Sequence, residues 1–219
     1  MEEQFKIPTE TVELPSKGLV YPENSPLSKG TVEMKYMTAK EEDILTNGNY
    51  IKNGTVIDRL LKSLIVTEGV DYNSLLLGDK NAIMVAARIL AYGAAYDINY
   101  RGEKITVDLS KINNKPIEEK LYKRGENEFS FILPSKNEIT YKLLTEGDEN
   151  AIDREIQGLK KLNKTSSADV TTRLKRMITS VNGNREVAHI RKYVDNYLLA
   201  TDARALRKEY DKVMPDVDL

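Results

Sequence analysis

The chain contains no cysteine and only one histidine among its 219 residues. The absence of cysteine excludes disulfides, thiolate metal sites and cysteine nucleophiles, and it fits a reducing cytoplasm. With His189 alone, the chain also lacks most of the usual ligands of zinc and the most common general base of hydrolases. These shortages argue against many of the common catalytic and metal-binding arrangements.

Neither sign of charge is in excess, because 33 Lys and Arg residues face 34 Asp and Glu residues, for a net charge of -1. This balance does not point to nucleic acid or to an anionic membrane as the partner. The N-terminal residues MEEQFKIPTE lack the apolar region of a signal peptide, and no apolar run reaches the ~20 residues needed to span a bilayer. The sequence therefore predicts neither export nor membrane insertion, and its 40% hydrophobic residues are enough for a sizeable core.

Motifs that carry known chemistry are also missing. There is no G-x-S-x-G turn for a nucleophilic serine and no glycine-rich phosphate loop. His189 has helical spacing and no marked partner, so it is interpreted as an ordinary helix-face residue. The acids Glu41-Glu42-Asp43 and Asp148-Glu149 fall in expected first helical turns, where they stabilise the helix dipole. We expect no enzyme activity, no cofactor and no metal.

The segment GDKNAIMVAARILAYG, from Gly78 to Gly93, gives the strongest helical signal. Asp79 stands where an N-cap carboxylate accepts from first-turn amides, and Gly93 offers the left-handed position at which a helix ends. The residues between them are apolar almost all round, which predicts a central helix buried on most sides. Arg88 interrupts this run. Its side chain either reaches the surface or pairs with a nearby acid, or it anchors a partner's carboxylate.

Residues 1–36 read as an extended, proline-rich arm. Pro8, Pro15, Pro22 and Pro26 recur every few residues, and prolines keep such segments at sheet edges or on the surface of another subunit. The arm either folds back on its own domain or serves in assembly. For the second case, the candidate partner-binding residues in the arm are Leu19, Tyr21 and Leu27.

The rest of the chain predicts an α+β fold. Residues 38–46 and 55–67 have helical patterns, the first with a capping box of Thr38 and Glu41. After residue 95 the period changes to 2, which predicts two β-hairpins and a mid-chain antiparallel β-sheet of about four strands. The expected strands are residues 96–100, 105–109, 128–133 and 138–144.

The last third is helical again. We expect a helix over residues 151–162, a helix capped by Ser167 or Asp169 that runs to residue 181, a helical segment around residues 187–198, and a final helix capped by Thr201 or Asp202. This organisation gives three regions: the arm (1–36), an α+β core (37–147) and a C-terminal helical region (148–219).

Two groups of residues favour binding rather than catalysis. Arg173, Lys175 and Arg176 form a basic run, which is either a solvated helix face or a contact for a nucleic-acid backbone. Twelve tyrosines against three phenylalanines suit protein interfaces, although a half-buried core position is the simpler reading for each one. Near the C-terminus, the candidate partner-binding residues are Arg204, Arg207 and Tyr210.

Several long motifs resemble one family. The residues VELPSKGLVYPENSPLSKGTVEMKYMTAKEEDILTN (12–47), GTVIDRLLKSLIV (54–66), LLLGDKNAIMVAARILAYG (75–93) and DARALRKEYDKVMPDVDL (202–219) are similar to the baseplate hub assembly proteins of T-even-type contractile-tailed phages. Some relatives in that group carry Cys-x-x-Cys motifs in the hairpin corresponding to residues 96–109 and beyond the C-terminal signature. This chain has NYRGE at positions 99–103 and no cysteine, so the resemblance implies no zinc here.

The resemblance implies a structural or assembly protein at the central hub of the tail baseplate. In that setting it would bind hub subunits and the tape-measure protein in the host cytoplasm before the tail tube polymerises. It would either remain in the virion or act as an assembly chaperone. A nucleic-acid-binding adaptor that uses the basic C-terminal helices is the alternative.

Overall fold

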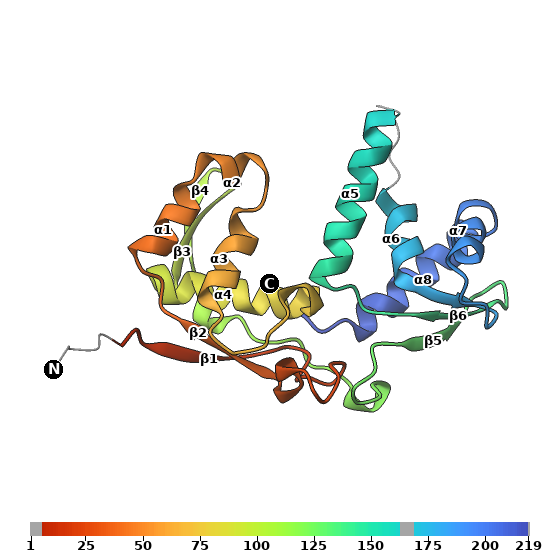
Figure 1. Cartoon of the computed structure of the whole chain (residues 1–219), viewed down its shortest axis with the longest axis horizontal. Coiled ribbons are helices and arrows are strands. Elements are labelled where there is room, and N and C mark those ends of the chain that lie inside the picture. The colour runs from red at the N-terminus through yellow and green to blue at the C-terminus, as the bar shows by residue number, and fades with distance from the viewer. Residues whose placement is uncertain (1–5, 163–168, 219) are drawn as a thin grey trace. The chain divides into compact units, whose positions relative to one another are not determined.

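The computed structural model describes residues 6–162 and 169–218, which form two compact units (Figure 1). Unit 1 is built from residues 6–70, 78–116 and 215–218. Unit 2 is built from residues 71–77 and 117–214, with 163–168 outside the described residues. The expectation of a cap at Ser167 therefore lies outside the description. The α+β class is confirmed in broad terms. Within the described residues, unit 1 has helices and two two-stranded antiparallel sheets, and unit 2 has helices and one three-stranded antiparallel sheet.

Residues 9–36 fold back onto unit 1. Strand β1 (Thr9–Glu13) pairs antiparallel with β2 (Thr31–Lys35), and the 3-10 helix η1 (Pro26–Lys29) lies between them. The apolar residues of this segment are buried, with Leu27 and Met34 fully inaccessible. Of the two alternatives for the proline-rich segment, the structure thus shows the first, and the segment supplies part of the core of unit 1.

Three helices follow β2 in unit 1. They are α1 (Ala39–Thr46), α2 (Gly48–Lys52) and α3 (Val56–Leu64). The capping box of α1 is confirmed, because Glu41 accepts hydrogen bonds from both the backbone and the hydroxyl of Thr38. Helix α3 ends three residues before the expected position, since Ile65 leaves the helix to form a β-bridge with Met34.

The central helix is α4 (Leu77–Tyr92), and it ends as expected at Gly93, whose φ is 79°. The assignment of Asp79 as its N-cap is wrong, because the helix starts two residues earlier. Burial on most sides is shown only in part: Ala82, Ile83 and Ala87 are buried and Met84 and Tyr92 are exposed, whereas the other apolar side chains of the helix are half-buried. One side of this apolar helix is therefore accessible at the surface.

A close approach fixes the start of α4. A Cβ built at Gly78 would lie 1.8 Å from the carbonyl oxygen of Pro215, so only glycine lets the C-terminal segment cross here. That segment is further held by Asn81, whose amide donates to Asp216 at 2.9 Å, and by a β-bridge between Asn114 and Val217. Residues 215–217 are therefore an integral part of unit 1.

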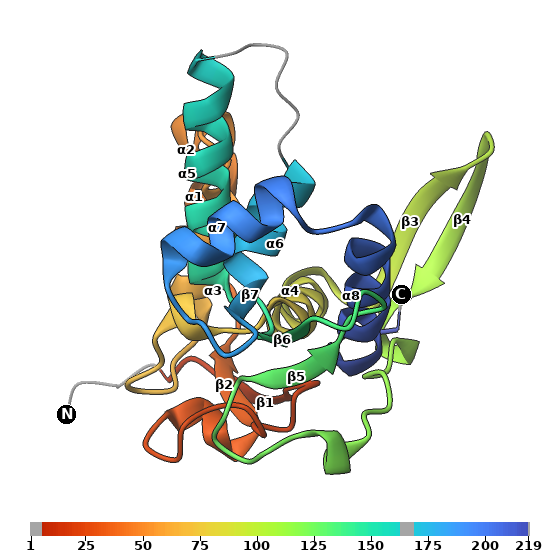
Figure 2. The ribbon, with the colours of Figure 1, turned by 90° about the vertical axis from the view of Figure 1, so that its right-hand side faces the viewer.

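Strands β3 (Ala95–Tyr100) and β4 (Glu103–Asp108) form the expected hairpin. Its turn has positive φ at Arg101 and Gly102, as two-residue hairpin turns favour. The hairpin extends from unit 1 as an isolated two-stranded ribbon (Figure 2). The sheet of about four strands is therefore wrong, because this hairpin and the next belong to different units.

Unit 2 contains the second expected hairpin, β5 (Phe129–Ile132) and β6 (Glu138–Tyr141). A third strand, β7 (Ile178–Val181), pairs antiparallel with β6. The expected helix up to residue 181 is wrong over this strand, since α6 (Asp169–Met177) stops where Ile178 turns into the sheet. β-Branched residues such as Ile178, Thr179 and Val181 pack well in a sheet.

The remaining helices of unit 2 are α5 (Glu146–Leu162), α7 (Val187–Asn196) and α8 (Ala200–Val213). Helix α5 begins five residues before the expected start. Thr201 and Asp202 do not cap α8, whose N-cap is Leu199, and buried Asp202 instead accepts from the Ser135 amide at 3.1 Å. No helix within residues 6–162 and 169–218 is long and apolar enough to cross a membrane.

Candidate functional site

An apolar groove in unit 1 is the best candidate for a binding site. It has a volume of about 410 Å³ and lies among α1, α3, α4 and the base of the β3–β4 hairpin. Several of its side chains are unusually open for their size, with Met84 40% and Tyr92 54% exposed. The residues that line it are Met37, Leu45, Ile57, Leu60, Leu61, Met84, Val85, Ala87, Arg88, Ala91, Tyr92, Tyr96 and Leu109.

The apolar surface continues from the groove along one face of the hairpin. Tyr96, Ile98 and Tyr100 alternate along β3 and therefore share one face, where Val107 and Ile105 stand opposite the first two. All five except Val107 are exposed. Because an isolated hairpin is only marginally stable in water, an uncovered apolar face of this kind suits contact with another chain.

Arg88 is the one charged residue among those lining the groove. Its guanidinium donates to the carbonyl oxygens of Gly93 at 3.0 Å and Ala95 at 3.4 Å, and it lies over the rings of Tyr92 and Tyr96. These contacts explain how a charge is tolerated in an apolar run, since a cation is favourable at a helix C-terminus and on an aromatic face. They leave the positive charge without a carboxylate partner within the described residues.

The expected partner-binding residues are placed differently by the structure. Tyr21 and Leu27 lie in the core of unit 1, and Tyr210 is buried in unit 2, where its hydroxyl accepts from the Leu144 amide. Because these three side chains are buried, the expectation that they are exposed to a partner is wrong. Leu19 is half-buried, whereas Arg204 and Arg207 are exposed on α8, so binding by the two arginines stays a prediction.

Sequence reasoning missed the residues of the groove. Met84 belongs to the apolar run from which burial of the central helix was predicted, and nothing in the pattern marked it or Ile57 as exposed. The alternation of Tyr96, Ile98 and Tyr100 did carry a signal, because an apolar face on a hairpin needs a cover.

The basic run on α6 is paired within unit 2. Arg173 binds Glu149 through both terminal nitrogens, Lys175 lies 2.6 Å from Asp195, and Arg176 donates to Asp148 at 2.7 Å. Each charge therefore faces a carboxylate, and no observation specifically favours a nucleic-acid backbone as its partner. His189 is exposed on α7, which confirms its interpretation as a helix-face residue.

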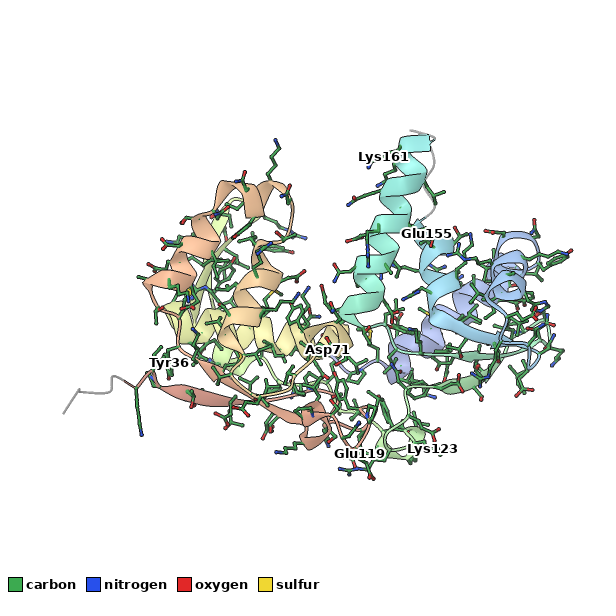
Figure 3. All side chains as sticks on the ribbon, viewed as in Figure 1. Tyr36, Asp71, Glu119, Lys123, Glu155 and Lys161 are labelled. Atoms are coloured by element: carbon green, nitrogen blue, oxygen red, sulfur yellow. The ribbon has the colours of Figure 1, made fainter. Side chains whose placement is uncertain are left out.

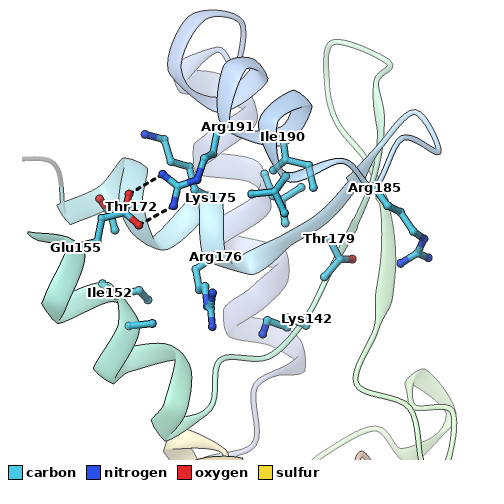
Figure 4. A pocket seen from close by; sticks show the side chains of 13 residues that line it. Lys142, Ile152, Glu155, Thr172, Lys175, Arg176, Thr179, Arg185, Ile190 and Arg191 are labelled. Carbon is cyan, nitrogen blue, oxygen red and sulfur yellow. Dashed lines mark hydrogen bonds and ion pairs between the residues drawn. The ribbon is translucent and has the colours of Figure 1, made fainter.

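A second hollow lies in unit 2 among α5, α6, β7 and α7, and it is strongly charged (Figure 4). Its volume is about 320 Å³. Glu155 lies on the side of α5 that faces α6 (Figure 3) and pairs with Arg191 of α7. The cationic residues that line the hollow are Lys142, Lys175, Arg176, Arg185 and Arg191.

Two aspartates with buried side chains occupy first helical turns. Asp79 accepts from the amide and hydroxyl of Ser16 and from the hydroxyl of Tyr21, and burial raises its pKa in spite of these neutral donors. Asp148 is also penalised by burial, yet Lys142, the Thr145 amide and Arg176 together hold its pKa below the ordinary value. The cations around Asp148 favour its ionised form, whereas burial among neutral donors favours the protonated form of Asp79.

No protein-family model, curated protein or solved structure gives a significant match to this chain. Within the described residues, no group of three or more His, Cys, Asp or Glu side chains has the arrangement of a metal site. The groove of unit 1 and the hollow of unit 2 are thus the candidate binding sites.

Proposed function

We propose that this protein is a protein-binding subunit of the baseplate hub of a contractile phage tail, and that it acts in hub assembly rather than in catalysis. The resemblance of residues 12–47, 54–66, 75–93 and 202–219 to T-even-type hub assembly proteins suggests the setting. The observation that carries a binding role is the apolar groove with the adjoining hairpin face. Both belong to unit 1, which contains the first three of those segments almost entirely.

The physical chemistry of the groove supports a protein as its occupant. Covering half-exposed side chains such as Met84, Tyr92 and Tyr96 would contribute on the order of 1 kcal/mol each from apolar area removed from water. The lining offers one charge, Arg88, and few other polar groups that could orient a small polar ligand. An amphipathic segment of a hub or tape-measure protein fits this surface.

Arg88 specifies the chemistry of that segment further. Its charge has carbonyl oxygens and aromatic rings around it and no carboxylate within the described residues. A segment that carries an Asp or Glu beside its apolar residues would supply the missing counter-charge, and the planar guanidinium favours a carboxylate geometrically. This proposal takes up the second of the two roles considered for Arg88.

The test is capture of partners from infected cells by the tagged protein, followed by mass spectrometry. We expect hub or tape-measure proteins to co-purify, and M84E to abolish their capture because it places a charge in the apolar groove. The matched control is I132E, since Ile132 is even more exposed, at 66%, but belongs to unit 2. Equal capture by M84E and the wild type would overturn the role of the groove.

A second experiment tests the setting. A phage lacking this protein should accumulate unassembled hub components and produce no finished tails, and normal tails would refute the proposal. Mass spectrometry of mature particles then separates the two forms of the role, because a structural subunit remains in the virion and an assembly chaperone does not.

A further inference from the structure

The charged hollow of unit 2 contains an uneven pairing of charges (Figure 4). Lys142 follows β6, Arg176 belongs to α6, and both donate to the same oxygen of Asp148, at 2.8 and 2.7 Å. The other oxygen of Asp148 accepts from the amide and hydroxyl of Thr145. Two cations therefore share one carboxylate, which is itself buried and fully engaged.

The other cations of the hollow are matched one to one. Arg191 binds Glu155 in a bidentate pair, and Arg185 binds Glu128 in the same way. Lys175 lies 2.6 Å from Asp195. The surplus positive charge of the hollow is thus located at Lys142 and Arg176.

Hydrogen-bond donors of Arg176 remain available at this place. Arg176 donates to Asp148 through Nε, and the structure shows no bond within the described residues from its two terminal nitrogens. The Arg176 side chain is half-exposed, so these two nitrogens can reach an anion in the hollow.

We propose that this hollow is a binding site for a phosphate group, held by Arg176 and Lys142. The guanidinium fork of Arg176 can donate two parallel hydrogen bonds to a phosphate, and Lys142 adds a second cation. The surplus charge gives an anion a net attraction that the paired cations alone would not. A volume of about 320 Å³ accommodates a phosphate group with part of the molecule that carries it.

This site is independent of the apolar groove, because its residues all belong to unit 2. Partner capture through unit 1 and anion binding in unit 2 can therefore succeed or fail separately. The likeness to hub assembly proteins contributes nothing to the argument for the site.

Titration of the ¹⁵N-labelled protein with sodium phosphate, at constant ionic strength, tests the proposal by NMR. We expect a saturable shift of the Arg176 Nε–H, and smaller, non-saturating changes with sodium acetate. R176Q should weaken phosphate binding by about tenfold or more, because it removes a direct donor. Absence of saturable shifts in the wild type, or equal binding of acetate, would overturn the assignment.

The matched control is R185Q, which removes a cation lining the same hollow whose charge is already neutralised by Glu128. It should leave the phosphate affinity nearly unchanged. If R185Q weakens binding as much as R176Q does, the attraction is diffuse and the specific site is wrong. An amide spectrum of R176Q that is unchanged away from the hollow would separate loss of binding from loss of folding.

Discussion

Asp79 in unit 1 and Asp148 in unit 2 occupy similar places and behave in opposite ways. Each lies in the first turn of a long helix, and each side chain is almost completely buried. Asp79 receives neutral donors from Ser16 and Tyr21, and burial raises its pKa. Asp148 receives two cations that outweigh burial and lower its pKa. Burial by itself therefore does not decide whether a carboxylate supports the folded state as an anion.

The same difference separates the two hollows. Unit 1 has an apolar groove with a single charge, whereas unit 2 has a hollow lined by five cations. In unit 1 the buried Asp79 accepts from neutral donors, and the surface of the groove is apolar, which suits a protein partner. In unit 2 the buried Asp148 is bonded by cations, and the hollow beside it is positively charged, which suits an anion. Replacing the two aspartates, and a third buried acid, tests this comparison.

Asp148→Asn should have the largest effect. The substitution keeps the shape but leaves Lys142 and Arg176 without their counter-charge, so we expect a loss of about 2–4 kcal/mol in the free energy of unfolding at neutral pH. Urea unfolding measures it. Because the pKa of Asp148 is lowered on folding, this contribution is present at neutral pH and disappears as the pH falls below the ordinary value of 3.8. A loss that is independent of pH would contradict the charge argument.

Glu41→Gln should have an intermediate effect, because Glu41 has one cation, Lys35, at 2.8 Å. Burial opposes its charge, but Lys35 and Thr38 lower its pKa from 4.5 to about 2. We expect a loss of about 2 kcal/mol at neutral pH. The stabilisation is complete above pH 4.5 and is lost as the pH falls towards 2. Urea unfolding of the wild type and of Glu41→Gln between pH 2 and pH 4.5 measures this loss. If the unfolding free energies of the two proteins depended equally on pH, the prediction would be refuted.

Asp79→Asn should have the smallest effect, about 1 kcal/mol or less at neutral pH, since its donors are uncharged. A pKa raised on folding makes the wild-type side chain more favourable below its ordinary pKa and less favourable as the pH rises. The difference in unfolding free energy should therefore shift in favour of Asp79→Asn as the pH is raised from acid to neutral. A shift in the opposite direction would mean that Asp79 is stabilised as an anion.

Much of the fold could be predicted from sequence signals that act over a few residues. The capping box at Thr38 and Glu41, the helix end at Gly93 and both hairpins follow from chemistry within a few residues. The parts of the fold that depend on contacts between distant residues could not be predicted in this way. Strand β7 could not be recognised because Ile178 and Val181 also fit the helical period that precedes them, and only pairing with β6 makes them a strand.

The candidate sites were harder to foresee for the same reason. The acids that neutralise Arg173, Lys175 and Arg176 lie 20 or more residues away, so the basic run looked free in the sequence. Tyr21 was chosen as an exposed contact, but its hydroxyl reaches Asp79, 58 residues further on. The exposure of a side chain depends on which distant segments pack against it. The proline-rich pattern of residues 1–36 therefore could not indicate that apolar side chains in this segment fill the core of unit 1.

The glycine contact at the start of α4 has a consequence for biosynthesis. Unit 1 is assembled from three separate stretches of chain, and the last of them, residues 215–217, passes over Gly78 and pairs with Asn114. During translation, everything between these stretches must leave the ribosome before that crossing can form. Unit 1, which the chain starts first, is thus completed only once residues 117–214 of unit 2 have also emerged.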